Sequence, residues 1–191
     1  MINLGNAKFL SILLPALILA AAAYAAAWDS SWGFEGRVSM RVTYTQSDAA
    51  RYLSYIEATK EKNTLDSQAS LEAYAARDAD RIARGEHPAA LYNALPSAGA
   101  IPREEALCIA YAYVEQTCQT PESLFLYLMP TVRFQANRND PEHNIWGISF
   151  HLSAEGRSDP AYAPFDHFFL SIDAATGTVV NCMGASVPAA G

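Results

Sequence analysis

The sequence predicts an α+β fold in which one helix lies across an antiparallel β-sheet. A helical pattern runs from Ile101 to Cys118, and its apolar residues recur at the spacing of one helix face. Segments of alternating apolar and polar residues follow it between positions 131 and 183. A helical region and a hydrophobic N-terminal segment precede it. A helix followed by strands that each have one apolar face is typical of a layered α+β domain.

The N-terminal segment, residues 9–28, is hydrophobic and contains no charge. It is long enough to span a bilayer as a helix, and small residues in its second half form the A-x-A patterns that signal peptidases cleave. Lys8 precedes the segment and Asp29 follows it, a bias that places the rest of the chain outside the cytoplasm. We expect residues 1–28 to be a signal peptide or a retained membrane anchor, with a buried helix as the third alternative. The protein is then extracytoplasmic, either secreted or anchored by this segment.

Residues 29–100 are expected to form a strand, a helical region and a linker. Strict alternation predicts a half-buried strand at 37–44. Two helices are expected, the first at 47–63 and the second at 66–84. A stretch rich in proline and small residues then separates this region from the helix that begins near residue 101.

Helical spacing also predicts which side chains of these two helices are buried. Leu53 and Ile56 lie on the expected apolar side of the first helix. Asp78 and Asp80 alternate with arginines in the second helix. Such alternation is typical of a solvated helix face, so both aspartates are expected to be exposed.

The helix from Ile101 to Cys118 is expected to have one buried face and one solvated face. Cys108 and Glu115 point away from the apolar face on a helical wheel. Glu104 and Glu105 complement the dipole of the first turn, and as neighbours in sequence they cannot face each other as an acid/base pair. The residues expected on the apolar face are Leu107, Ala110, Tyr111, Val114 and Cys118.

Four strands are expected at 131–136, 145–152, 167–173 and 178–183. Their alternation predicts an inward face made of Val132, Phe134, Ala136, Trp146, Ile148, Phe150, Leu152, Phe168, Leu170, Ile172, Val180 and Cys182. The opposite face carries Ile145, Phe169, Val179 and Met183, which is more apolar than usual for a solvated face. We expect either the helices before Ala94 or a partner protein to cover part of it.

The sequence "FFLSIDAATGTVV" at 168–180 places one acid and one glycine between two apolar runs. Its spacing does not match a phosphorylated or proteolytic aspartate motif. Asp173 is instead expected to accept hydrogen bonds from the backbone of a turn, and Gly177 to supply the positive φ that closes a hairpin.

No catalytic, cofactor-binding or metal-binding set is predicted, and no cofactor is expected. The net charge of −7 and the absence of a basic cluster argue against nucleic acid as a partner. The histidines lack zinc-motif spacing. His151 and His167 would nevertheless share the outer sheet face if their strands are neighbours, where they could bind a metal or sense pH, although the sequence indicates no third ligand.

Three cysteines are present, Cys108, Cys118 and Cys182. If Cys108 and Cys118 share a helix, they lie about 15 Å apart, which is too far for a disulfide. An internal disulfide must therefore use Cys182. The pair Cys118 and Cys182 could meet across the core, and two buried thiols are the alternative.

The residues "EEALCIAYAYV", "IWGISF" and "FLSIDAATGTVV" together resemble the PepSY domain, over about residues 101–183. The family occurs in propeptides of secreted metallopeptidases and in membrane-anchored or secreted bacterial proteins. Its fold is similar to that of the cystatins, a helix packed on a curved antiparallel sheet. The resemblance implies that residues 101–191 form a PepSY-like domain. Two departures are the long connection after Leu152 and the region before residue 101, which has no counterpart.

The resemblance also implies a function, because the family is not known for catalysis. It implies a non-catalytic binding protein at the cell envelope, with a protein or peptide partner, that modulates a protease or another envelope protein. The alternative is a structural or assembly subunit of a membrane-associated envelope complex, held in the membrane by an uncleaved N-terminal segment.

Overall fold

The computed structural model describes residues 39–61, 63, 68–86, 89–117, 121–162 and 165–183. They belong to one compact unit of the chain, 38–191. The hydrophobic segment at 9–28 lies outside the described residues. Among the described helices, none has the length and apolar character needed to cross a membrane.

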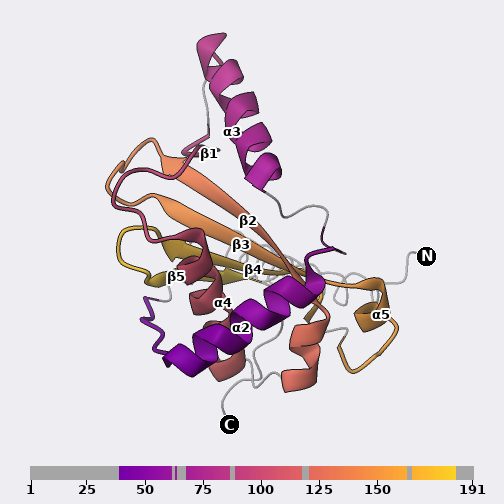
Figure 1. Ribbon diagram of the computed structural model, residues 1–191. Coiled ribbons are helices and arrows are strands. Elements are labelled where there is room, and N and C mark those ends of the chain that lie inside the picture. Colours follow the sequence, from indigo (N-terminus) through magenta and orange to yellow (C-terminus); the bar gives the residue numbers. More distant parts are fainter. Residues whose placement is uncertain are drawn as a thin grey trace, which may run out of the picture. The chain divides into compact units, whose positions relative to one another are not determined.

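The protein has an α+β fold built on a five-stranded antiparallel sheet with the strand order β1-β2-β3-β4-β5 (Figure 1). The strands are β1 (Leu91–Asn93), β2 (Leu128–Asn137), β3 (Ile145–Leu152), β4 (Phe168–Asp173) and β5 (Val179–Met183). Each strand pairs with the next one along the chain, as is common for consecutive strands. The short edge strand β1 falls in the stretch that the sequence predicts to be a linker, where three residues are too few to show an alternation.

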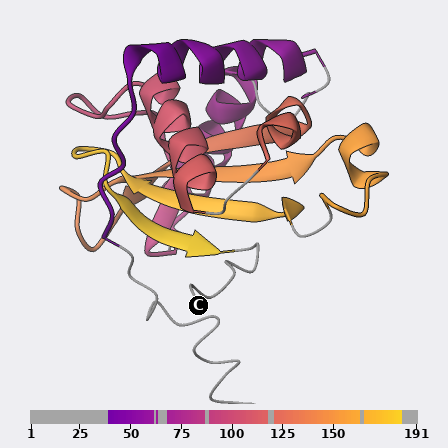
Figure 2. The same ribbon diagram turned by 90° about the horizontal axis from the view of Figure 1, so that it is seen from below.

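Helix α4 (Arg103–Thr117) lies across the inner face of the sheet, and helix α2 (Gln46–Thr59) lies over α4 (Figure 2). All residues of α4 from Ala106 to Val114 are buried. The expectation that one face of this helix is solvated is therefore wrong for its central turns. Cys108, which was expected on that face, is buried. The helix is covered on both sides because α2 adds a third layer, which also explains why its apolar residues do not form a single stripe.

Helix α2 begins with a capping box and buries aromatic rather than aliphatic side chains. Thr45 Oγ1 accepts a hydrogen bond from the amide of Asp48, and the Asp48 carboxylate accepts one from the amide of Thr45. Tyr52 and Tyr55 are buried, whereas Leu53 is 40% exposed. The prediction that Leu53 is buried is therefore wrong, because tyrosine rings supply the buried apolar area, whereas Ile56 is partly buried against the core as expected.

The core between α2, α4 and the sheet is rich in stacked aromatic rings. Tyr111 of α4 packs against Tyr52 at 5.8 Å between ring centroids and against Phe150 of β3 at 5.0 Å. Phe125 belongs to the 3₁₀-helix η1 (Glu122–Leu126) and stacks on Tyr55 at 5.7 Å. Because buried aromatic pairs contribute about 0.5–1.5 kcal/mol beyond their area, these contacts join the three layers into one core. Helix α2, before residue 100, and helix α4, after it, therefore contribute to the same core.

Helix α3 (Gln68–Ala83) lies at the β1 edge of the sheet. Asp78 accepts hydrogen bonds of 2.8 Å from the backbone amide and from the side-chain amide of Asn93 in β1. Asp78 is buried, so the expectation that it lies on a solvated face is wrong. Its carboxylate accepts a hydrogen bond from a backbone N–H group of the edge strand that would otherwise face solvent.

The free edge of β5 contacts residues upstream of α2. Met40 and Val179 exchange backbone hydrogen bonds of 2.9 and 3.0 Å. This isolated bridge is the only strand-like pairing among the described residues of the predicted strand at 37–44. In β5 itself a register shift places both Val179 and Cys182 opposite inward residues of β4, so Val180 does not face the core as predicted.

Candidate functional site

The connection between β3 and β4, residues 153–167, is the longest irregular segment between two described elements of the sheet. It contains one short helix, α5 (Ala154–Arg157). Binding and catalytic residues lie disproportionately on surface loops of this kind.

The start of this connection is anchored to the domain by its own side chains. Ser153 caps α5, since its Oγ accepts a hydrogen bond of 3.2 Å from the amide of Gly156. Gly156 lies against Tyr127 so closely that an added Cβ would stand 2.7 Å from the Tyr127 Cβ. The ring of Tyr127 also packs on Tyr162, at 5.6 Å between centroids. The connection is therefore held at several points, while residues 157–161 between these anchors are exposed.

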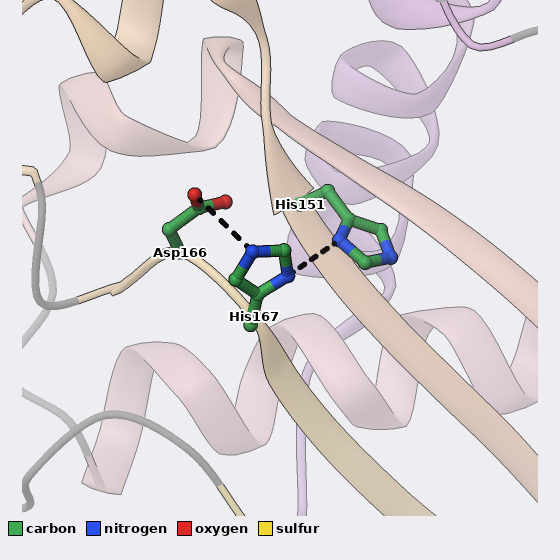
Figure 3. A group of neighbouring side chains, drawn as sticks. All are labelled: His151, Asp166 and His167. Carbon is green, nitrogen blue, oxygen red and sulfur yellow. Dashed lines mark hydrogen bonds and ion pairs between the residues drawn. The ribbon is translucent and has the colours of Figure 1, made fainter.

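His151 and His167 face each other at the base of the connection (Figure 3). Phe150 pairs with Phe168 in the antiparallel ladder, so the next positions outward, His151 and His167, stand opposite each other. Their Nδ1 atoms are 3.1 Å apart. This juxtaposition confirms the expectation that both imidazoles lie on the outer side of neighbouring strands.

Asp166 is the third member of this group, and the sequence pattern did not predict it. Its Oδ2 lies 3.6 Å from His167 Nε2, and its Oδ1 accepts a hydrogen bond of 3.1 Å from the amide of Leu152. One donor atom from each of His151, Asp166 and His167 can be chosen so that all lie within 4.8 Å of one another. The signal in the sequence that could have revealed Asp166 is its position directly before His167.

His167 has a backbone conformation that residues with a side chain rarely adopt. Its φ is +65°, and no other described residue except glycine has a positive φ. Such conformations cost about 1–3 kcal/mol and persist where the surrounding structure requires them, often at functional sites. Here the conformation directs the His167 ring toward both His151 and Asp166 (Figure 3).

Burial and the neighbouring imidazole control the protonation of His151. Desolvation, followed by the charge of His167, lowers the pKa of His151 below its usual value. His151 is therefore neutral at neutral pH, with a lone pair on one ring nitrogen. Arg157 Nη1 stands 3.9 Å from Asp166 Oδ2 and adds one positive charge near the carboxylate.

Asp173 and Gly177 lie in the turn between β4 and β5. Asp173 Oδ1 accepts hydrogen bonds from the amides of Ala175 and Thr176 at 3.1 and 2.8 Å, and from Thr176 Oγ1 at 2.8 Å. Gly177 has a φ of +70°, and its amide donates to the Asp173 carbonyl at 2.9 Å. Asp173 Oδ2 contacts His143. All these partners of Asp173 belong to turns, which gives its carboxylate a structural role.

The cysteines do not form a site among the described residues. Cys118 lies outside them, so the predicted pairing of Cys118 with Cys182 stays a prediction. Cys182 is partly buried on the inward side of β5. Burial, with a smaller effect from Glu105 and Glu104, raises the pKa of Cys108 to about 11, so that its thiol stays protonated and poorly nucleophilic.

The geometry therefore singles out one candidate site, the exposed β3–β4 connection with two imidazoles and a carboxylate at its base. This arrangement can hold a cation, and the described part of the loop can be presented to a partner. The sequence analysis identified the loop and the two histidines separately, but not the carboxylate that completes the group. Comparison with protein-family models, with curated protein sequences and with solved structures finds no match to this chain.

Proposed function

We propose that this protein is a non-catalytic binding protein of the cell envelope, which contacts a protein or peptide partner through the connection at 153–167. The observation that carries the proposal is the form of this connection. It exposes consecutive residues from Arg157 to Ala161, yet it is anchored by packing at Gly156 and Tyr162. An anchored loop loses little conformational entropy on binding, which favours affinity.

Two sequence features support the envelope location and the kind of activity. The uncharged segment at 9–28 directs the chain to a membrane. The resemblance to the PepSY domain implies binding rather than catalysis, with a protease or another envelope protein as the partner. The exposed charges of the loop, Arg157 and Asp159, are suited to orient such a partner.

Site-specific photo-crosslinking in the native cell tests the proposal. A benzoylphenylalanine at Ser158 is expected to capture a defined protein partner. The same residue at Glu142, which is exposed in the β2–β3 connection, is the matched control and is expected to give no such adduct. Equal capture at both positions, or none at Ser158, contradicts a binding role for the loop.

The captured partner then allows a quantitative test with purified proteins. Arg157→Glu is expected to weaken binding by about tenfold or more, which is about 1.4 kcal/mol. Arg138→Glu inverts an exposed charge in the β2–β3 connection and is expected to leave the affinity unchanged. Similar losses in the two variants would point to a general charge effect, and an unchanged affinity for Arg157→Glu would remove this loop from the interface.

A further inference from the structure

We propose that His151, Asp166 and His167 bind a divalent transition-metal ion, with Zn²⁺ as the ion that their geometry fits best. This site lies at the base of the β3–β4 connection and is independent of the proposed partner binding.

The spacing of the donor atoms is close to that of a zinc site. Zn²⁺ binds imidazole nitrogen at about 2.0–2.1 Å in a tetrahedron, which places two ligand atoms about 3.3 Å apart. The Nδ1 atoms of His151 and His167 are 3.1 Å apart. One donor atom from each of the three residues can be chosen so that all lie within 4.8 Å of one another. A bound ion would draw the Asp166 carboxylate from its present contact with His167 Nε2, at 3.6 Å, into the coordination sphere.

The chemical nature of the donors selects the class of ion. Two imidazoles and one carboxylate suit Zn²⁺ and neighbouring transition metals, whereas Ca²⁺ and Mg²⁺ prefer sites made entirely of oxygen atoms. The His167 side chain is 71% exposed, so water can reach the ion and occupy a fourth position. Three protein ligands and one water satisfy tetrahedral coordination.

Two further features hold the ligands ready for an ion. The Leu152 amide donates to Asp166 Oδ1 at 3.1 Å, which keeps the carboxylate beside the two imidazoles. The positive φ of His167 places its ring beside His151, at a cost in backbone strain. A shared ion would replace the hydrogen bond that the two Nδ1 atoms form without metal and would bind all three residues at once.

Such an ion would join the end of β3 to the start of β4 and thereby close the base of the connection at 153–167. His151 lies in β3, while Asp166 and His167 precede β4 directly. The loop would then be tethered at both ends, so its local opening would become less frequent when metal is bound.

Titration of the full-length chain, purified in detergent without a histidine tag, tests the site. Calorimetry with ZnCl₂ is expected to show one ion per chain, and Co²⁺ is expected to give the intense visible absorption of tetrahedral coordination. His151→Ala, Asp166→Asn and His167→Asn are each expected to weaken Zn²⁺ binding by about 100-fold or more, since even outer-shell changes cost about 10- to 100-fold. The asparagine at position 167 tolerates the positive φ, and the asparagine at 166 keeps the acceptor for Leu152.

His143→Gln is the matched control, because it removes one imidazole from the other end of the sheet and should leave Zn²⁺ affinity unchanged. The proposal is overturned if the wild-type chain binds no Zn²⁺ or if the three ligand variants bind it as tightly as the wild type. It is also overturned if the control weakens binding to the same extent. Circular dichroism and thermal unfolding of each variant establish that it is folded.

Limited trypsin digestion gives an independent readout. Arg157 lies within the connection, and its side chain is 52% exposed. Zn²⁺ is expected to slow cleavage after Arg157 in the wild type and in His143→Gln, but not in His167→Asn. Slowing of equal size in His167→Asn would show that the ion acts elsewhere and would overturn the site.

Discussion

His143 Nδ1 lies 2.8 Å from Asp173 Oδ2, so a histidine of the β2–β3 connection contacts the turn that joins β4 to β5. The Asp173 carboxylate is buried, while the His143 side chain is 58% exposed. Hydrogen bonding to Asp173, assisted by the charge of Asp140, raises the pKa of His143. Burial opposes ionisation of Asp173, but the hydrogen bonds from His143, Thr176 and Ala175 outweigh it and lower its pKa.

This pair predicts a pH-dependent contribution to stability. Because the pKa of His143 is raised on folding, its stabilising effect is complete below the unfolded value of about 6.5 and is lost as the pH rises through the folded value. The lowered pKa of Asp173 acts in the opposite sense, and its effect is lost as the pH falls below about 4. His143→Gln is therefore expected to lower the melting temperature more at pH 5.5 than at pH 8.5. Thermal unfolding of both proteins at the two pH values checks this, and a pH-independent difference contradicts it.

Gly177→Ala is expected to destabilise the domain by about 2–3 kcal/mol. Its φ is +70°, and an added Cβ would lie 3.0 Å from Ile109 Cδ1 of α4. The left-handed conformation alone costs about 1–2 kcal/mol for a residue with a Cβ, and the contact adds to it. Gly85→Ala is the matched control, since Gly85 has a φ of +79° but no atom within 4 Å of the added Cβ. Urea unfolding should show a larger loss of unfolding free energy at position 177 than at position 85. Equal losses would show that the contact with Ile109 does not contribute.

Arg51 of α2 and Glu115 of α4 are expected to be energetically coupled. Arg51 Nη1 and Nη2 donate to the two Glu115 oxygens at 2.7 and 3.0 Å, and the Tyr52 hydroxyl donates to the same carboxylate. A bidentate, partly buried pair should give a coupling energy of about 1–2 kcal/mol in a double-mutant cycle of Arg51→Ala and Glu115→Ala.

The pair Lys60 and Glu57 provides the control for this cycle. Its atoms are 3.2 Å apart, but the side chains are 66% and 72% exposed. Solvent screening should limit its coupling to about 0.5 kcal/mol or less. A similar value for both pairs would mean that the α2–α4 contact depends on apolar packing alone.

Asp78→Ala is expected to cost about 1–3 kcal/mol, because it leaves the amide of Asn93 without its acceptor at the sheet edge. Asp80→Ala is the control on the same helix, since the Asp80 side chain is 65% exposed, and its effect should stay within about 0.5 kcal/mol. Chemical unfolding measures both. Hydrogen exchange should also show faster exchange of the Asn93 amide in Asp78→Ala, and unchanged exchange would contradict the edge-capping role.

The alternation of apolar residues in β2, β3 and β4 was sufficient to predict the strands and their inward faces. Trp146, Ile148 and Phe150 are buried as expected, because each strand has one face against α4. The same reasoning failed for Val180, where a register shift in β5 changes which residues face inward. A bulge depends on the pairing with a neighbouring strand, which local alternation does not contain.

The sequence by itself determined the α+β class, the helix at 103–117 and the order of the last four strands, because periodicity reports which side chains share one face of an element. Only the tertiary structure decided how the elements pack on one another. It placed α2 over α4, so that Cys108 became buried and Glu115 met Arg51, and it brought Asp166 to His151 across the base of a long connection. Such contacts join residues from different elements, and no local spacing rule specifies how those elements pack.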